Sequence, residues 1–255
     1  MKILKNITVF TMVMLLSVST VLEAREKNIS NFSSSASNLV DSTGTFDGNK
    51  IYADVANNGL FLDYHVSGDS ALEWPKGTGV HSIFQSALWM GATVNGSIRT
   101  IVGDYTQDMG PGPWGGDPLA AVHRIYKVEK SMLASPLDFA DFQEWPVEFG
   151  APWVDVDGDG VYTPLPGGTD HPEFLGDQVL WFVSNDGDPA YKLNFGTSPM
   201  NVEIQTTMFG FDRPDVFGDM VFLKQLVINK GDDDLVDTYM GLWSDPDLGY
   251  AGDDF

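Results

Sequence analysis

The sequence contains no cysteine, so neither a disulfide bond nor a lipid attached through an N-terminal cysteine is available to this chain. Exported domains often use disulfides for stability. A cysteine-free one must instead rely on a large hydrophobic core, on bound metal ions, or on both. The chain has 255 residues, which is enough for one large sandwich or two small domains.

Basic residues are also scarce. The chain has 14 Lys and Arg against 36 Asp and Glu, which gives a formal net charge of −22 at pH 7. Such a surface repels nucleic acid and anionic membranes, so neither is expected as a partner. An excess of acids is typical of proteins that hold divalent cations, although solubility alone is the alternative explanation. The clustering of many aspartates in short loops favours cation binding.

The familiar catalytic motifs are missing as well. The four histidines are scattered without a zinc-binding spacing, and the sequence has no Gly-x-Ser-x-Gly elbow, P-loop or dinucleotide fingerprint. A carboxylate pair of the glycosidase type remains as an alternative, with Glu73, Glu144 and Glu203 as candidate members. A binding or structural module is therefore favoured over an enzyme.

The N-terminus has the pattern of a secretory signal peptide. Lys2 and Lys5 precede an apolar stretch over residues 7–21, and the small residue Ala24 stands just before a charged segment. The stretch is short and interrupted by hydroxyl side chains, which disfavours the alternative of an uncleaved anchor. We expect a signal peptide over residues 1–24, a mature protein without a membrane span, and a location outside the cell or on the outer cell surface.

The remaining chain divides into two parts. Residues 25–49 are rich in Ser and Thr and are expected to be a flexible linker. Residues 50–255 contain short apolar or alternating runs separated by Asn, Asp, Gly and Pro, which predicts strands and turns. The predicted strands cover residues 50–56, 60–65, 87–94, 97–102, 179–183, 202–211, 220–228 and 235–243.

Two local signals refine this pattern. Asn95-Gly96 lies between two strand candidates and tolerates positive φ, which predicts a tight β-hairpin. Ser135-Pro136 has the composition of a helix start and predicts one helix ending near Trp145, before Pro146. The fold expected from these signals is mainly β, an antiparallel β-sandwich with long Asp/Gly/Pro-rich loops and one short helix.

The strongest chemical signal is the loop that begins at Asp155. Asp155, Asp157 and Asp159 occupy positions 1, 3 and 5 of a calcium-type loop, Gly160 occupies position 6, and the carbonyl of Val161 stands at position 7. Carboxylates at this spacing can converge on one hard cation, and a flexible set of oxygen ligands favours calcium over magnesium. Ca²⁺ is thus the expected cofactor, with an unoccupied acidic turn as the alternative.

The loop cannot be an EF-hand, because position 12 is Pro166 and nearby prolines prevent flanking helices. A carboxylate from beyond the loop must complete the site. Asp170, Glu173 and Asp177 are the candidates, and we expect Asp177 because it directly precedes a predicted strand that would hold it in place.

Further acidic loops carry a weaker signal of the same kind. A second metal site is a candidate at Asp245, Asp247, Asp253 and Asp254, and the segment 184–189 offers a similar composition. For both, ordinary turn chemistry of Asp, Asn, Gly and Pro is the favoured interpretation, with a second ion as the alternative.

The aromatic residues suggest a second function. Seven tryptophans on a calcium-stabilised sandwich suit carbohydrate stacking, but they suit a large core equally well. Trp89, Trp181 and Trp243 lie in strand runs and are expected in the core. That leaves Trp74 and Trp114 as candidate ligand platforms, although for Trp114 a lid on the core is favoured, because large aromatic side chains are usually buried.

Several motifs together resemble one group of proteins. They lie at residues 73–79, 87–91, 150–162, 176–178, 203–210 and 242–249. This set is similar to the N-terminal region of large secreted surface proteins of Bacteroidota-like bacteria. Such proteins often contain fibronectin-type-III-like modules and end in a sorting domain for type IX secretion. The resemblance implies cell-surface export and a region that continues past Phe255, but it implies no particular activity.

The expected function is a secreted or cell-surface calcium-binding structural or adhesion module, with glycans or other surface proteins as partners. The alternative is a carbohydrate-binding module or part of a secreted glycoside hydrolase.

Overall fold

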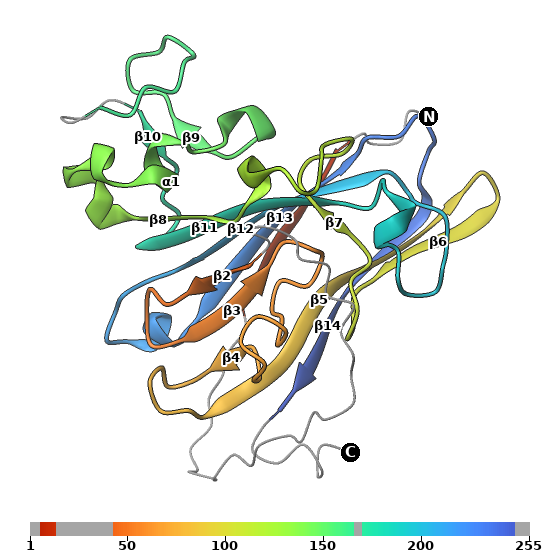
Figure 1. Cartoon of the computed structure of the whole chain (residues 1–255), viewed down its shortest axis with the longest axis horizontal. Helices are drawn as coiled ribbons and strands as arrows, with labels where there is room; N and C mark the ends of the chain where they lie inside the picture. The colour runs from red at the N-terminus through yellow and green to blue at the C-terminus, as the bar shows by residue number, and fades with distance from the viewer. Residues whose placement is uncertain (1–5, 14–42, 166–169, 248–255) are drawn as a thin grey trace.

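The computed structural model of the chain describes residues 6–13, 43–165 and 170–247. These residues form two antiparallel β-sheets packed face to face, with a layer of turns and short helices over the outer face of one sheet (Figure 1). The predicted antiparallel, mainly β class is confirmed. Among the described residues, no helix is both long and apolar enough to cross a membrane.

The first sheet has six strands in the order β1-β13-β12-β11-β7, and β8 also pairs with β11. Every residue of β11 is buried, because one face of this strand meets the second sheet and the other meets the outer layer. This double burial explains its continuous apolar run. The strands are β1 (Asn6–Val13), β7 (Gly110–Pro111), β8 (Tyr126–Glu129), β11 (Gln178–Asn185), β12 (Val202–Gly210) and β13 (Val221–Asn229).

The second sheet has the order β14-β5-β4-β3-β2, and β6 also pairs with β5. The predicted hairpin is confirmed: Asn95 and Gly96 join β5 to β6 with φ values of 50° and 78°. Two successive residues with positive φ match the right-handed twist of the flanking strands. The strands are β2 (Thr43–Phe46), β3 (Tyr52–Ala56), β4 (Leu72–Glu73), β5 (His81–Val94), β6 (Ser97–Val102) and β14 (Val236–Pro246).

The core between the sheets consists of two apolar clusters. In one, Ile83 of the second sheet packs with Leu180 and Met208 of the first. In the other, Leu88 and Met90 pack with residues of β12 and β13. Alternation along each strand brings these side chains to the shared face, as a sandwich requires.

The outer layer makes a third cluster on the opposite face of the first sheet. Phe142 and Trp145 pack onto Val179 and Trp181 of β11. This layer holds α1 (Ala140–Gln143) and the two-stranded sheet of β9 (Trp153–Val154) and β10 (His171–Pro172). The 3-10 helices of the described residues are Ala121–His123, Lys130–Ala134, Pro136–Asp138, Val147–Phe149, Pro189–Tyr191 and Val216–Asp219.

The predicted helix from Ser135 to Trp145 is only partly formed. Ser135 makes no side-chain cap hydrogen bond, and extended backbone at Phe139 separates a 3-10 turn from the short helix α1. Phe142 and Trp145 are buried, whereas Leu137 and Phe139 stay exposed. Packing of Phe142 and Trp145 onto β11 therefore decides the chain path, and it overrides the local capping signal.

The linker prediction is wrong for its last residues. Thr43–Phe46 form β2, which pairs with β3, and the side chain of Phe46 is fully buried. Backbone pairing and the burial of one large apolar side chain are enough to form a strand here, although the Ser- and Thr-rich composition predicted a flexible linker. Residues 25–42 lie outside the described residues. The predicted strand over residues 60–65 is reduced to one isolated bridge between Leu62 and Ser86.

Part of the expected signal peptide also pairs with the first sheet. Asn6–Val13 form β1, antiparallel to β13. Removal of residues 1–24 would therefore leave the backbone groups on that side of β13 unpaired, and the mature sheet would end in a nine-residue edge strand.

A buried ionic network links the segment before β7 to the segment that follows β11. The Lys192 ammonium lies 3.4 Å from Asp108 Oδ2 and 3.6 Å from Asp186 Oδ2, and all three side chains are at most 2% exposed. Asp186 also accepts hydrogen bonds from the backbone N–H groups of Met200 and Val202, both at 2.7 Å. Burial nevertheless raises the pKa of Asp186 above its ordinary value. The segment 184–189 thus uses its buried aspartate as a turn acceptor.

Candidate metal centre

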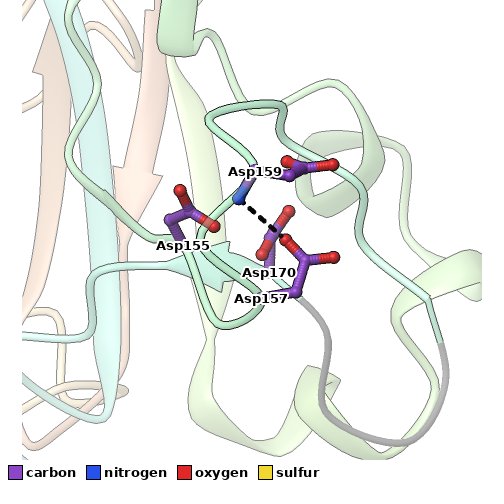
Figure 2. A group of neighbouring side chains, drawn as sticks. All are labelled: Asp155, Asp157, Asp159 and Asp170. Atoms are coloured by element: carbon purple, nitrogen blue, oxygen red, sulfur yellow. Dashed lines mark hydrogen bonds between the residues drawn. The ribbon is translucent and has the colours of Figure 1, made fainter.

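The aspartate loop belongs to the connection between the two strands of the small sheet in the outer layer. Val154 pairs with His171, so Asp155 directly follows one strand and Asp170 directly precedes the other. Two residues that are fifteen positions apart in sequence are thereby brought to the same end of the hairpin. Figure 2 shows Asp170 among the three loop aspartates.

Four carboxylates form the group. Asp155, Asp157, Asp159 and Asp170 each offer an oxygen, and these oxygens all lie within 4.8 Å of one another. Ligands on opposite sides of a calcium ion are separated by about 4.6–5.2 Å, twice the usual calcium–oxygen distance. The spacing therefore suits one calcium ion, and the carboxylates can supply most of its six to eight oxygens.

Backbone hydrogen bonds shape the loop. Gly158 N and Gly160 N donate to the two oxygens of Asp155 at 2.7 and 2.9 Å. Asp159 N donates to Asp157 Oδ1 at 3.2 Å, the dashed line in Figure 2. Both glycines have a φ of 77°, which other residues adopt only with strain. The two glycines let the loop turn back on itself and gather its carboxylates.

Asp170 is the buried member of the group. It is 1% exposed, whereas the other three aspartates are exposed. Its oxygens accept hydrogen bonds from Val156 N at 2.9 Å and Thr163 N at 2.8 Å. Asp170 thus fastens both sides of the loop while it faces the other carboxylates. Four carboxylates this close repel one another, and a divalent cation relieves that repulsion.

The expectation that Asp177 completes the group is wrong. Asp177 directly precedes β11 of the first sheet, and its Oδ2 accepts a hydrogen bond from Asp212 N at 3.0 Å. Its carbonyl accepts another from Lys130 N at 2.9 Å. Local sequence signals predict a strand next to Asp177, but the strand that positions the fourth carboxylate is β10, which is only two residues long. The pairing of β9 with β10 selects Asp170.

Val161 N donates to Asp159 Oδ1 at 2.7 Å, and its carbonyl, the expected ligand at position 7, accepts from the Thr163 hydroxyl at 3.4 Å. Tyr162, the next residue, anchors this side of the loop through a 2.6 Å hydrogen bond from its hydroxyl to the carbonyl of Phe142. Burial first, and then the charge of Asp170, raise the pKa of Tyr162, so its hydroxyl stays protonated and remains a donor.

Two members of the second candidate metal group, Asp245 and Asp247, lie among the described residues, so the group as a whole stays a prediction. Asp245 accepts a hydrogen bond from the Tyr105 hydroxyl at 2.9 Å, and Asp247 accepts one from the Ser70 hydroxyl at 2.7 Å. Burial and the charge of Asp245 raise the pKa of Tyr105 to about 12. Asp253 and Asp254 lie outside the described residues.

The tryptophans are distributed differently from the prediction. Trp181 is in the core as expected, but Trp89 is 36% exposed and stacks on Trp243 on the outer face of the second sheet. Trp74 packs against a core cluster and donates to Asp219 Oδ1 at 3.0 Å, so it is not a free platform. Trp114 is 44% exposed. Strand position alone did not reveal which face of the sheet each ring would occupy.

The three candidate glycosidase carboxylates are each engaged elsewhere. Glu73 accepts from Gly79 N, Glu144 pairs with Arg124, and Glu203 is 1% exposed and pairs with Lys230. These contacts give all three a structural explanation.

Comparison with protein-family models, with curated proteins and with solved structures finds no match. The resemblance to exported surface proteins stays a prediction.

Proposed function

We propose that the chain is an exported structural or adhesion module of the cell surface, stabilised by one calcium ion bound at Asp155, Asp157, Asp159 and Asp170. The observation that carries the proposal is the convergence of four carboxylate oxygens from both sides of a hairpin within 4.8 Å. The absence of cysteine supports it, because an exported protein without disulfides gains from a metal that fastens its loops.

Direct titration tests the metal. By calorimetry we expect one calcium ion per chain, with a dissociation constant of about 10⁻⁴ to 10⁻³ M, as in other extracellular sites. Asp157→Asn should weaken binding at least tenfold, since it removes one charged ligand but keeps an amide oxygen that can still accept the hydrogen bond from Asp159 N. Asp177→Asn is the matched control and should bind as wild type does. Unaltered binding in Asp157→Asn, or no heat of binding in wild type, would contradict the site.

Mass spectrometry of exported material tests the compartment. We expect a mature N-terminus at Arg25, because the charged and apolar segments before it have the order of a signal peptide. Lys2→Glu combined with Lys5→Glu should reduce export, while Lys27→Glu, just past the expected cleavage site, should not. An exported protein that retains Met1 would refute cleavage.

A further inference from the structure

A groove opens on the side of the sandwich, between the loop that follows β7 and the segment that follows β11. It encloses about 370 Å³, and the side chains used below are those of Trp114, Asn185, Asp188, Tyr191 and Asn201. It lies on segments that take no part in the aspartate loop.

The loop that carries Trp114 is firmly held. Asn185 Nδ2 donates to the carbonyls of Gly112 at 2.9 Å and Pro113 at 3.2 Å, and Trp114 N donates to Glu203 Oε2 at 3.0 Å. Glu203 is itself buried. Although Gly and Pro alternate through this segment, the loop is a fixed wall.

A hydrogen bond from the pyrrole N–H orients the indole of Trp114. Its Nε1 donates to Asn201 Oδ1 at 3.3 Å, and a Cβ at Gly187 would lie only 2.7 Å from its Cδ1. The close approach therefore requires glycine at position 187. The side chain is anchored but still 44% exposed, which distinguishes it from a lid folded onto the core.

Tyr191 supplies a second aromatic surface. Its ring lies against Gly110, where a Cβ would come within 3.0 Å of Cδ2. Burial, followed by the charges of Asp188 and Asp117, raises the pKa of Tyr191, so its hydroxyl is protonated at neutral pH. Among the described residues this hydroxyl has no hydrogen-bond partner.

Polar groups that are free to bind a ligand lie beside the two rings. Asp188 uses Oδ1 to accept from Ala190 N at 2.9 Å, and its Oδ2 has no partner within the described part of the chain. Asn201 uses Oδ1 for Trp114, and its Nδ2 is likewise unpartnered by described residues. Acceptors and donors therefore stand together near the aromatic surfaces.

This combination matches the chemistry of a sugar. The apolar face of a pyranose ring packs on an exposed aromatic ring. The hydroxyls of the sugar both donate and accept hydrogen bonds, so they can pair with the carboxylate, amide and phenol groups of the groove. The net charge of −22 disfavours acidic polymers. We propose that the groove between Trp114 and Tyr191 binds a neutral carbohydrate.

Calorimetric titration with neutral hexasaccharides tests the proposal. The panel contains β-1,4-glucan, xylan, mannan and chitin oligomers, with hexagalacturonate as an acidic comparison and a proline-rich peptide as a competing class of ligand. We expect wild type to bind at least one neutral oligomer. Trp114→Ala and Tyr191→Ala should each weaken that binding at least tenfold.

Two further variants separate the groove from other aromatic surfaces. Gly187→Ala should weaken binding although every ligand-contacting side chain remains, because the new methyl displaces the indole. Phe195→Ala is the matched control, since Phe195 is 78% exposed and outside the groove, and it should bind normally.

Several results would overturn the proposal. They are no binding of any neutral oligomer by wild type, binding that survives Trp114→Ala and Tyr191→Ala, binding lost instead in Trp89→Ala, or selective binding of the proline-rich peptide. Thermal melting of each variant in calcium checks that it is folded. Calcium titration of the same samples keeps a failure of the metal site distinct from a failure of the groove.

Discussion

In about 5 mM calcium the wild-type protein is expected to melt roughly 5–9 °C higher than in excess EDTA. With a dissociation constant of about 10⁻⁴ M, binding to the folded state alone contributes RT ln 51, or roughly 2.3 kcal/mol. Differential scanning calorimetry in the two buffers measures the shift. Magnesium should substitute poorly, because it demands a smaller and stricter ligand sphere.

The variants distinguish a ligand from a structural residue. Asp157→Asn should lose most of the calcium-dependent shift in melting temperature. In both buffers it should melt close to the temperature at which wild type melts in EDTA. Asp170→Asn should lower the melting temperature in both buffers, because its carboxylate also accepts two backbone N–H groups. Asp177→Asn should shift as wild type does. Equal melting of wild type in calcium and EDTA would mean that the loop is only a turn.

Replacing Lys192 with methionine is expected to lower the free energy of unfolding by about 3–5 kcal/mol. The substitution removes the cation from between Asp108 and Asp186 and leaves two buried carboxylates without it. Urea denaturation followed by tryptophan fluorescence measures the loss. Lys224→Met is the control: its partner Glu173 is 4.0 Å away and both side chains are more than 40% exposed, so we expect about 0–1 kcal/mol.

The pH dependence of this effect has a definite sign. Burial already holds the pKa of Asp186 above its ordinary value of 3.8, and loss of the nearby cation should raise it further. A group whose pKa is higher in the folded state favours folding as the pH falls towards that pKa. The difference in the free energy of unfolding between wild type and Lys192→Met should therefore become smaller as the pH falls from 7 to 5. A loss no larger than that of Lys224→Met would show that the network contributes little.

Sequence reasoning located the longer strands because their signals are local. Alternation and continuous apolar runs predicted β11, β12, β13 and β14 to within a few residues, and Asn95-Gly96 predicted the hairpin between β5 and β6. The strands β4, β7, β9 and β10 were missed because each has two residues, too few to show a period.

The sites were predicted in the same partial way. Three aspartates of the carboxylate group share one short segment, so their spacing identified them, whereas the place of Asp170 in the group depends on a hairpin that composition did not reveal. Tyr191 could not be paired with Trp114 because the two meet only through the β7–β11 contact. Trp89 and Trp243 were misplaced because a strand pattern fixes alternation but not which face lies outward.

The aspartate loop lies in the outer layer that covers Trp181, and this location affects which part of the molecule unfolds first. The described residues between 130 and 176 contribute to the third apolar cluster but not to the two clusters between the sheets. Such a layer can open locally while the sandwich stays closed. Under the calcium proposal, the ion sets the free energy of that opening. Amide exchange and protease cleavage in the layer would then follow external calcium, while the amides of β12 would stay protected.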